Sequence, residues 1–288
     1  MSTRFHPSDN PEHPDLRILP LHDLIEHEYN DIDRTRPLAE KLEAEGLLKN
    51  PPVVTPLEDD PHRFVVLDGA NRITALSLLD YPHILVQVVP YHPPTVTLTT
   101  WHHVIAGLDP KLLTADLSAL EGIDLILTDP LRARAGLSRR EYLMYVIRAD
   151  GEVFAARMSE PGQEIKVQNA MLNALVNTYK DRCSLHRVMT EDLEEVSRLF
   201  PDSAGIVVFP QYDPSEVLDL ARDGELLPAG LTRHLIQGRA LRINYPLHEL
   251  KSDETPAVKN ERLQSWFEQK IKTREVRFYG ETTYIFDE

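Results

Sequence analysis

The junction at residues 65–76 combines residue types that could hold an anion. An apolar run, Val65 to Leu67, is broken by Asp68-Gly69 and continued at once by a helical pattern. Gly69 permits a tight turn, and the free backbone N–H groups at the start of the helix would face an anion. Arg72 adds a guanidinium, whose fork of donors suits a phosphate. The alternative is that Asp68 caps an ordinary helix.

A second candidate is the pair of carboxylates at Glu26 and Glu28, which flank His27. In an extended segment the two side chains share a face, whereas in a helix they diverge by about 200°. Such a pair could supply a general base. In a chain with this many acidic residues, a solvated acidic turn is the alternative.

A third candidate, Trp101-His102-His103, follows the β-branched run 95–100. Adjacent histidines in a strand point to opposite faces, and no HExxH motif or cysteine cluster accompanies them, so a zinc site is disfavoured. Trp101 with one pocket-facing histidine fits substrate recognition, and core packing is the alternative.

The last candidate is the polar run Thr232-Arg233-His234, which follows the Pro/Gly-containing segment 228–230. A hydroxyl, a guanidinium and an imidazole in sequence could bind phosphate oxygens. The alternative is a loop in which Thr232 caps a short turn.

Composition favours small-molecule chemistry. The 288 residues carry a formal charge of −15, with 42% hydrophobic residues, which is a globular composition that disfavours broad contact with nucleic acid or an anionic membrane. The single cysteine, Cys183, excludes an internal disulfide. No apolar stretch approaches the roughly 20 residues of a membrane helix, and residues 1–15 have no apolar signal region. We therefore expect a cytoplasmic protein without membrane or nucleic-acid partners. Its oligomeric state is left open.

The pattern along the chain predicts an α/β (α+β) protein. Residues 1–15 are expected to be a disordered lead, 16–95 a compact unit with a mixed sheet, 96–250 a second, smaller α/β domain, and 251–288 a helix with a closing hairpin. The expected strands are 16–19, 52–55, 64–67, 83–89, 95–100 and 205–210, with hairpins at 142–156 and 274–286. The expected helices are one containing Leu38 and Leu42 and closed by Gly46, then 69–79, 166–179, 214–222 and 263–271.

The order of these pieces resembles a known fold. The segment Leu24 to Tyr29, then Pro52-Val53-Val54, then Asp68 to Arg72 is similar to the ParB/sulfiredoxin-like fold, whose members hold nucleotide phosphates on a Gly-x-x-Arg turn. Thr100-Trp101 and the stretch from Gly224-Glu225 to Thr232-Arg233-His234 extend the likeness to the free L-serine kinases of that superfamily. That resemblance covers residues 17–250 and leaves 251–288 outside. It implies transfer of a phosphoryl group from ATP or ADP, with Mg²⁺, to free L-serine, giving O-phospho-L-serine.

The resemblance also implies roles for individual residues. Glu28 falls at the position of the catalytic carboxylate, and Asp68 at that of an acidic residue near the transferred phosphoryl group and its magnesium. Nucleotide binding is expected of Gly69, Ala70, Asn71, Arg72, Thr232, Arg233 and His234, and substrate binding of Thr100, Trp101 and His102. One departure is that the family commonly has histidines where Ala70 and Asn71 stand, so a proton-transfer role is lost there.

Three other functions belong to proteins with a related fold. A ParB-type nucleotide-dependent regulator that binds DNA requires a basic helix-turn-helix, whereas the only close basic cluster here is Arg132 to Arg140. A ligand-sensing regulator that keeps the kinase fold is a related alternative. A sulfiredoxin-like reductase is excluded, because its cysteine is missing from the phosphate turn.

Overall fold

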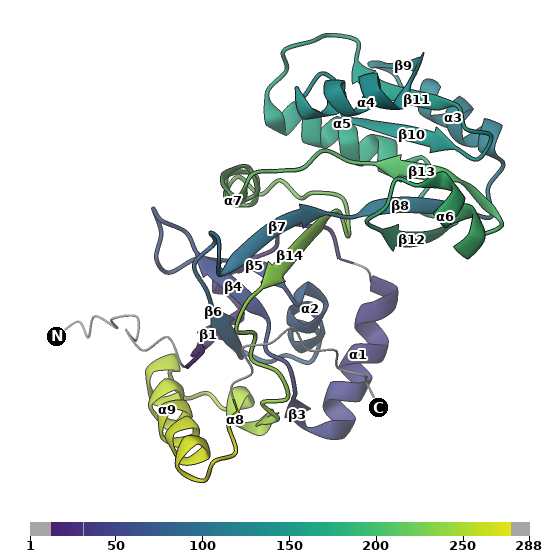
Figure 1. The fold of residues 1–288 in the computed structure, drawn as a ribbon. Helices are drawn as coiled ribbons and strands as arrows, with labels where there is room; N and C mark the ends of the chain where they lie inside the picture. Colours follow the sequence, from purple (N-terminus) through teal and green to yellow (C-terminus); the bar gives the residue numbers. More distant parts are fainter. Residues whose placement is uncertain (1–12, 31, 278–288) are drawn as a thin grey trace. The chain divides into compact units, whose positions relative to one another are not determined.

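The computed structural model describes residues 13–30 and 32–277 (Figure 1). It divides into two compact units. The first takes in residues up to Glu26, residues 30–97 and those from His234 onward, and the second takes in residues 27–29 and 98–233. Both units contain helices and strands, so the mixed α/β architecture expected from the sequence is confirmed.

A five-stranded mixed sheet forms the centre of the first unit, in the order β1-β6-β4-β5-β2. Neighbouring pairs along it are antiparallel, parallel, antiparallel and parallel in turn. Its inner strands are largely apolar because both faces of the sheet are covered, with the buried Thr55 and Gln87 as polar exceptions. The strands are β1 (Asp15–Pro20), β2 (Leu24–Ile25), β4 (Val53–Pro56), β5 (Phe64–Asp68) and β6 (His83–Val88).

Two helices of the first unit lie side by side. α1 (Ile32–Glu45) packs against α2 (Ala70–Leu78), and Gly46 ends α1 in the left-handed region, as the sequence predicts (Figure 1). Leu42, Ile73 and Leu76 are buried between these helices and the sheet. Shorter elements complete the unit: η1 (Leu21–Asp23), β3 (Leu47–Leu48), β15 (Tyr245–Pro246) and α8 (His248–Lys251).

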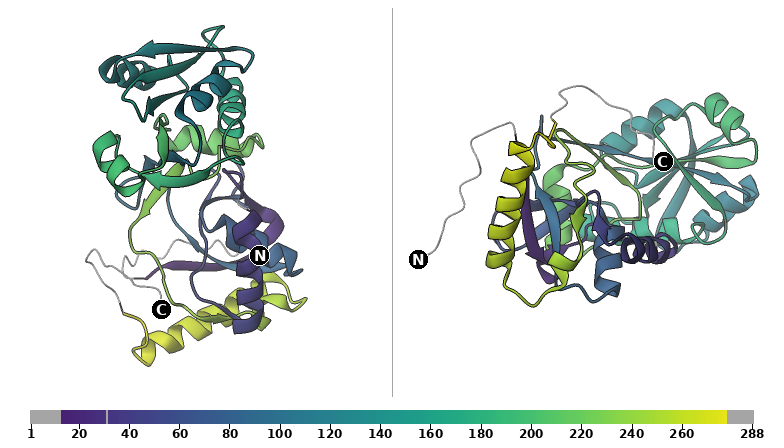
Figure 2. Two further views of the ribbon diagram at one scale, coloured as in Figure 1. Left: turned by 90° about the vertical axis from the view of Figure 1, so that its right-hand side faces the viewer. Right: turned by 90° about the horizontal axis from the view of Figure 1, so that it is seen from below.

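The last helix, α9 (Pro256–Lys272), runs beside β1 (Figures 1 and 2). It begins seven positions before the predicted 263–271, because Pro256 at its first position is compatible with a helix start. The Asn260 side chain bonds both the N–H and the C=O of Ile18 at 2.8 Å. Of the predicted closing hairpin, residues 274–277 form no strand, and the remainder lies outside the described residues, as does most of the expected N-terminal lead.

The second unit is built on a six-stranded sheet in the order β12-β8-β13-β10-β11-β9. All neighbouring pairs are antiparallel, and the predicted hairpin is β10 with β11, joined through Asp150-Gly151. The strands are β8 (His102–Ala106), β9 (Ile123–Thr128), β10 (Met144–Arg148), β11 (Val153–Met158), β12 (Ser184–Val188) and β13 (Ser203–Val208). Its helices are α3 (Pro110–Ser118), α4 (Pro130–Ser138), α5 (Ile165–Asn177), α6 (Leu193–Leu199) and α7 (Pro214–Arg222).

Two further strands connect the units along the chain. β7 (Val96–Thr100) and β14 (Thr232–Ile236) form a two-stranded sheet, and the chain passes from one unit to the other within each of them. Residues from His234 onward group with the first unit, whereas the sequence placed 234–250 with the second domain. The sequence-based domain boundaries at 95 and 250 remain a proposal.

Candidate active site

The turn between β5 and α2 adopts the conformation that an anion cradle requires. Gly69 precedes α2 with φ +97° and ψ 21°, a left-handed conformation that favours glycine. A methyl group on Gly69 would lie 2.9 Å from both Cα and Cβ of Pro52. No side chain in the described part of the chain caps the helix start, so the interpretation of Asp68 as an ordinary helix cap is wrong. The N–H groups of Ala70 and Asn71 begin the helix without intrahelical acceptors.

Asp68 instead accepts from two arginines. Arg72 Nη2 donates to Asp68 Oδ2 at 2.8 Å, and Arg239 Nη2 donates to the same oxygen. Within the described residues no hydrogen bond uses Asp68 Oδ1. Sequence reasoning missed Arg239, which lies 171 positions from Asp68 in a loop that carries no recognisable motif. The three side chains together carry a net charge of +1.

Arg72 is held on its other side by the backbone. Its Nη1 donates to the carbonyl of Asn50. Burial lowers the pKa of Arg72, Asp68 raises it, and the nearby Arg239 lowers it further. Because an arginine guanidinium keeps its proton in proteins, Arg72 remains a fixed cation at the first turn of α2.

Glu28 belongs to the second unit, where its carboxylate is fixed by the segment before and within β14. Oε2 accepts from the N–H of Gly230 at 2.8 Å, and Oε1 accepts from both the N–H and the hydroxyl of Thr232 at 2.5 Å. The side chain is 15% exposed. The acidic segment around Glu28 therefore supplies the carboxylate, and the segment from Gly230 to Thr232 supplies its hydrogen-bond donors.

His27 extends this arrangement by one hydrogen bond. Its Nε2 lies 2.8 Å from Thr232 Oγ1, whose single proton is directed to Glu28. His27 Nε2 is therefore assigned as the donor, because Thr232 can accept only from a protonated ring nitrogen. Nearby, the guanidinium of Arg187 covers Gly230 so closely that a methyl there would lie 2.1 Å from Nη2.

Residues 232–234 form a strand and not the turn-capping loop considered above. Neighbouring side chains along a strand alternate, and each of these three has a different partner. Thr232 binds Glu28, Arg233 lies 4.8 Å from the ring centre of Trp101, and the His234 ring is 2.7 Å from the Tyr91 hydroxyl. The described structure thus shows no compact Thr-Arg-His cluster.

The predicted substrate residues Thr100, Trp101 and His102 lie where β7 ends and β8 begins. Thr100 Oγ1 donates to the carbonyl of Pro210 at 3.3 Å, and the Trp101 N–H donates to the carbonyl of Leu231 at 2.8 Å. Burial lowers the pKa of His102, an effect that Glu191 partly opposes. The structure thus anchors Trp101 beside the segment that holds Glu28.

The adjacent His103 is a core residue. It is 2% exposed and packs edge-on against Phe209 and Tyr179. Burial and, to a lesser degree, Arg187 lower its pKa to about 4. Among the described residues no group of three or more His, Cys, Asp or Glu side chains is placed to hold a metal ion.

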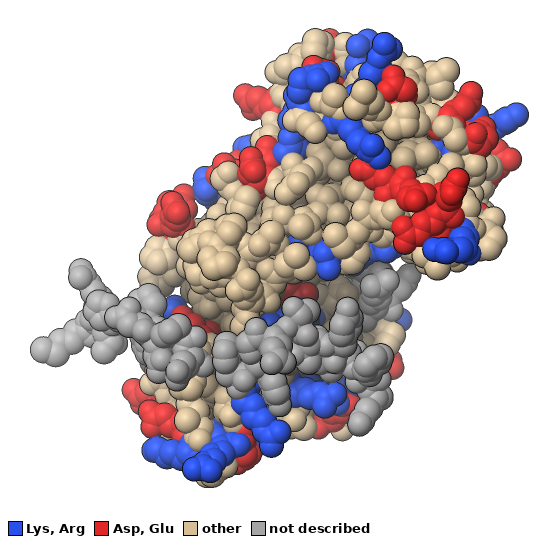
Figure 3. All heavy atoms as spheres, viewed as in Figure 1, with Lys and Arg blue, Asp and Glu red and all other residues tan. Residues whose placement is uncertain are grey.

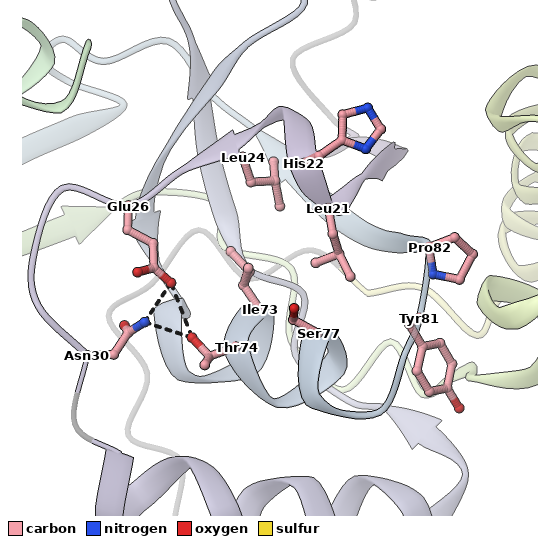
Figure 4. A pocket seen from close by; sticks show the side chains of 10 residues that line it. All are labelled: Leu21, His22, Leu24, Glu26, Asn30, Ile73, Thr74, Ser77, Tyr81 and Pro82. Carbon is pink, nitrogen blue, oxygen red and sulfur yellow. Dashed lines mark hydrogen bonds between the residues drawn. The ribbon is translucent and has the colours of Figure 1, made fainter. Parts of the chain in front are cut away.

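Glu26, the other carboxylate of the acidic pair, lines a groove of the first unit (Figure 4). The groove has a volume of about 510 Å³ and runs between η1, β2 and α2. Glu26 Oε1 accepts from Asn30 Nδ2 at 2.6 Å and from Thr74 Oγ1 at 3.1 Å. The two carboxylates therefore have separate surroundings, and only that of Glu28 is built from backbone donors.

The arginines of the basic cluster are all neutralised by carboxylates. Arg132 pairs with Asp129, Arg134 with Glu191, Arg139 with Glu141 and Arg140 with Glu216. On the face shown in Figure 3, basic and acidic side chains are interspersed with no continuous basic stripe over the described residues. This distribution gives a DNA-binding function no support. No helix in the described part of the chain is long and apolar enough to span a membrane.

Comparison with known proteins gives no matching family model, but it does find relatives that are similar over most of their length. The ATP-dependent L-serine kinase SbnI of Staphylococcus aureus is 24% identical over 281 residues, covering 96% of this chain and 98% of that protein. An ATP-dependent L-serine kinase of Staphylothermus marinus is 24% identical over 248 residues, covering 83% of this chain and 93% of that protein. The first alignment includes most of residues 251–288, which the resemblance judged from sequence left outside.

Solved structures share the fold. A C-terminally truncated SbnI from Staphylococcus aureus superimposes with a TM-score of 0.66 at 21% identity, covering 90% of this chain and 97% of that one. A free serine kinase variant in complex with AMP superimposes with a TM-score of 0.69 at 18% identity, covering 85% of this chain and 98% of that one. Another variant of a free serine kinase contains ADP.

Proposed function

We propose that this protein is an ATP-dependent kinase that phosphorylates free L-serine to O-phospho-L-serine. The proposal is supported by similarity to ATP-dependent L-serine kinases over 96% and 83% of the chain. The structural observation that carries it is the fixed carboxylate of Glu28, which is aligned by two backbone N–H groups and a hydroxyl. Phosphoryl transfer asks a protein mainly to position its reactants and stabilise charge, and a carboxylate fixed in this way suits that task.

Glu28 is proposed to accept the proton of the serine hydroxyl. A carboxylate has about four lone-pair positions. Oε1 already has two donors, whereas Oε2 has one within the described residues, so Oε2 retains a position for the substrate hydroxyl. The serine Oγ then forms a bond to the γ-phosphorus of ATP as the bond between that phosphorus and the β–γ bridging oxygen breaks. ADP leaves, and Glu28 returns its proton to solvent.

The turn at residues 69–72 is proposed to bind the nucleotide phosphates. Gly69 allows close approach, Ala70 and Asn71 present the N–H groups at the start of α2, and Arg72 supplies a cation. The Asn71 side chain can add a donor but cannot shuttle protons. We also assign to the nucleotide site Thr232, Arg233 and His234, and to the serine site Thr100, Trp101 and His102.

Asp68 is the proposed protein ligand for Mg²⁺. Mg²⁺ in kinases is commonly held by one or two carboxylates together with substrate phosphates, and it keeps several waters. The unused Oδ1 of Asp68 fits that donor set, whereas Oδ2 is occupied by two arginines. When bound with the nucleotide, the ion would neutralise charge on the phosphate oxygens.

The first unit is proposed to be a ParB/sulfiredoxin-like domain, on the basis of its mixed sheet and its Gly-x-x-Arg turn. We propose the cytoplasm as its location, because free serine and ATP are available together there.

The proposed activity can be tested directly. Purified protein is incubated with Mg²⁺, L-serine and either ATP or ADP, and phosphoserine is detected by mass spectrometry, with D-serine and a serine-containing peptide as alternative acceptors. Phosphoserine formed from L-serine and ATP supports the proposal. Nucleotide turnover without phosphoserine would assign the enzyme a different acceptor, and absence of turnover together with DNA binding would favour the regulator.

A further inference from the structure

We propose that Arg239 is a phosphate-binding residue of the nucleotide site, positioned by the buried side chain of Gln87. This inference rests on the proposed function and extends it to a residue outside every motif considered above.

The first observation concerns charge at the start of α2. Arg239 and Arg72 both donate to Asp68 Oδ2, and Asp68 can neutralise only one of them. The remaining positive charge lies at Asp68, in the turn that leads into α2, and the first N–H groups of that helix, those of Ala70 and Asn71, have no intrahelical acceptors. Two guanidinium groups next to a helix start would provide a multidentate site for an anion with several oxygens.

The second observation is an unsatisfied donor. Arg239 Nε is buried and has no hydrogen-bond partner among the described residues, although the side chain as a whole is 30% exposed. A buried N–H of a charged group is unfavourable when it lacks an acceptor. A phosphate can accept from Nε and a neighbouring Nη together, in the bidentate geometry that guanidinium groups favour. A bound phosphate would therefore satisfy the donor that residues 13–30 and 32–277 leave unpaired.

The third observation is how the loop carrying Arg239 is fixed. Gln87 lies in β6, is 3% exposed, and interrupts a strand that is otherwise apolar after His83. Its Nε2 donates to the carbonyl of Gly238 at 3.0 Å, and its Oε1 accepts from the N–H of Ala240 at 2.8 Å. The amide thus holds the backbone on both sides of Arg239. A buried polar side chain with both ends satisfied in this way specifies one conformation.

The same loop is also tied to Asn50. The Asn50 side chain accepts from the N–H of Arg242 at 2.9 Å, and its backbone carbonyl accepts from Arg72. Asn50 therefore links the loop of Arg239 to the Arg72 guanidinium. Arg242 itself is exposed, which makes it a matched control with the same charge.

The experiment measures binding of pyrophosphate, ADP and adenosine by calorimetry, directly or by competition, to the full chain and to R239A, R239K, R242A and Q87L. We expect R239A to weaken binding of pyrophosphate and ADP about ten- to a hundredfold, the effect of losing a charged hydrogen bond. Adenosine binding should be unchanged, R239K should keep part of the affinity, and R242A should match the wild type. Q87L should weaken pyrophosphate binding in the same direction, and Q87L/R239A should add little to R239A.

Two results would overturn the inference while leaving the kinase intact. In one, R239A binds pyrophosphate and ADP as the wild type does. In the other, R239A loses adenosine affinity as strongly as ADP affinity, so that the residue supports the fold and not the phosphates. If the wild type binds none of the three compounds, this inference and the proposed function fall together, and the phosphoserine assay separates that case from the others.

Discussion

Thr232 binds the Glu28 carboxylate twice, through its backbone N–H and its hydroxyl, across 204 positions of sequence. The hydroxyl in turn faces His27, the residue before Glu28. A carboxylate with three donors loses most of its freedom to rotate. Such preorganisation matters in phosphoryl transfer because misplacement of a reacting group by about 1 Å can cost on the order of 10²-fold in rate.

The first prediction concerns the proposed base. Glu28→Gln should lower the rate of phosphoserine formation by about 10²- to 10⁴-fold, because an amide cannot accept the serine proton. The amide NH₂ would also face one of the donors from Gly230 or Thr232. Stopped assays at saturating ATP and serine give the rate, and calorimetry with ADP tests whether the nucleotide still binds.

Glu26→Gln is the matched control for this variant. Glu26 lies two positions away, and its carboxylate is bound by Asn30 and Thr74. The control should form phosphoserine at a rate near that of the wild type. Equal losses in the two variants would remove the reason to assign the base to Glu28.

Much of the first unit follows from local sequence signals. The strands near 16–19, 52–55, 64–67 and 83–89 are mainly apolar runs of strand length. One predicted helix ends at Gly46 and the next begins after Gly69, and both glycines adopt the left-handed backbone that glycine permits. In the second unit, the sequence did not predict α3 and α4. Each of these helices nevertheless begins with Asp-Pro, in which the aspartate is the N-cap and the proline suits the first helical position. Short helices with few apolar residues give a weak periodic signal.

The partners of the site residues could not be predicted in the same way. The sequence shows Glu28 and Thr232 as two polar stretches, but their hydrogen bonds depend on the pairing of segments about 200 residues apart. Arg239 gives no local signal, because an arginine in a loop is ordinary in any soluble protein. Gln87 was a usable signal, since an amide within an apolar strand must find buried partners.

The second prediction concerns the turn before α2. Gly69→Ala and Gly46→Ala both place a methyl group on left-handed backbone, at a strain cost of roughly 1–2 kcal/mol. At Gly69 the methyl group also meets Pro52, whereas at Gly46 no atom of the described residues lies within 4 Å of it. We expect Gly69→Ala to lower the free energy of unfolding by at least about 1 kcal/mol more than Gly46→Ala, and to weaken ADP binding. Urea unfolding and calorimetry give the two quantities, and indistinguishable variants would refute the close approach of Pro52.

The third prediction concerns pH. His103 has a pKa of about 4 in the folded protein, lowered mainly by burial, against about 6.5 in an unfolded chain. Between these values the unfolded state binds one more proton, so stability should fall as pH drops from about 6.5 toward 4 and be fully present above that range. The total change attributable to His103 is roughly 3 kcal/mol.

His103→Asn isolates this contribution. The variant should be less stable than the wild type at neutral pH, because the ring packs against Phe209 and Tyr179. Its stability should nevertheless fall less steeply with acidification, by up to about 1.4 kcal/mol per pH unit. Urea unfolding at several pH values between 4.5 and 7.5 gives both slopes, and parallel slopes would exclude His103 as the titrating group.

The fourth prediction uses Trp101 as a reporter. The chain has two tryptophans, and Trp266 packs edge-on against Tyr245 in the first unit, while Trp101 lies under the Arg233 guanidinium. A ligand that contacts Trp101 or displaces Arg233 changes the surroundings of the indole, so addition of L-serine with ADP should change the emission. The change should persist in Trp266→Phe and disappear in Trp101→Phe. Trp101→Phe should also raise the KM for serine more than it lowers kcat, because it removes a binding contact and leaves Glu28 in place. A fluorescence change that survives in Trp101→Phe, or an unchanged KM, would place the serine site away from Trp101.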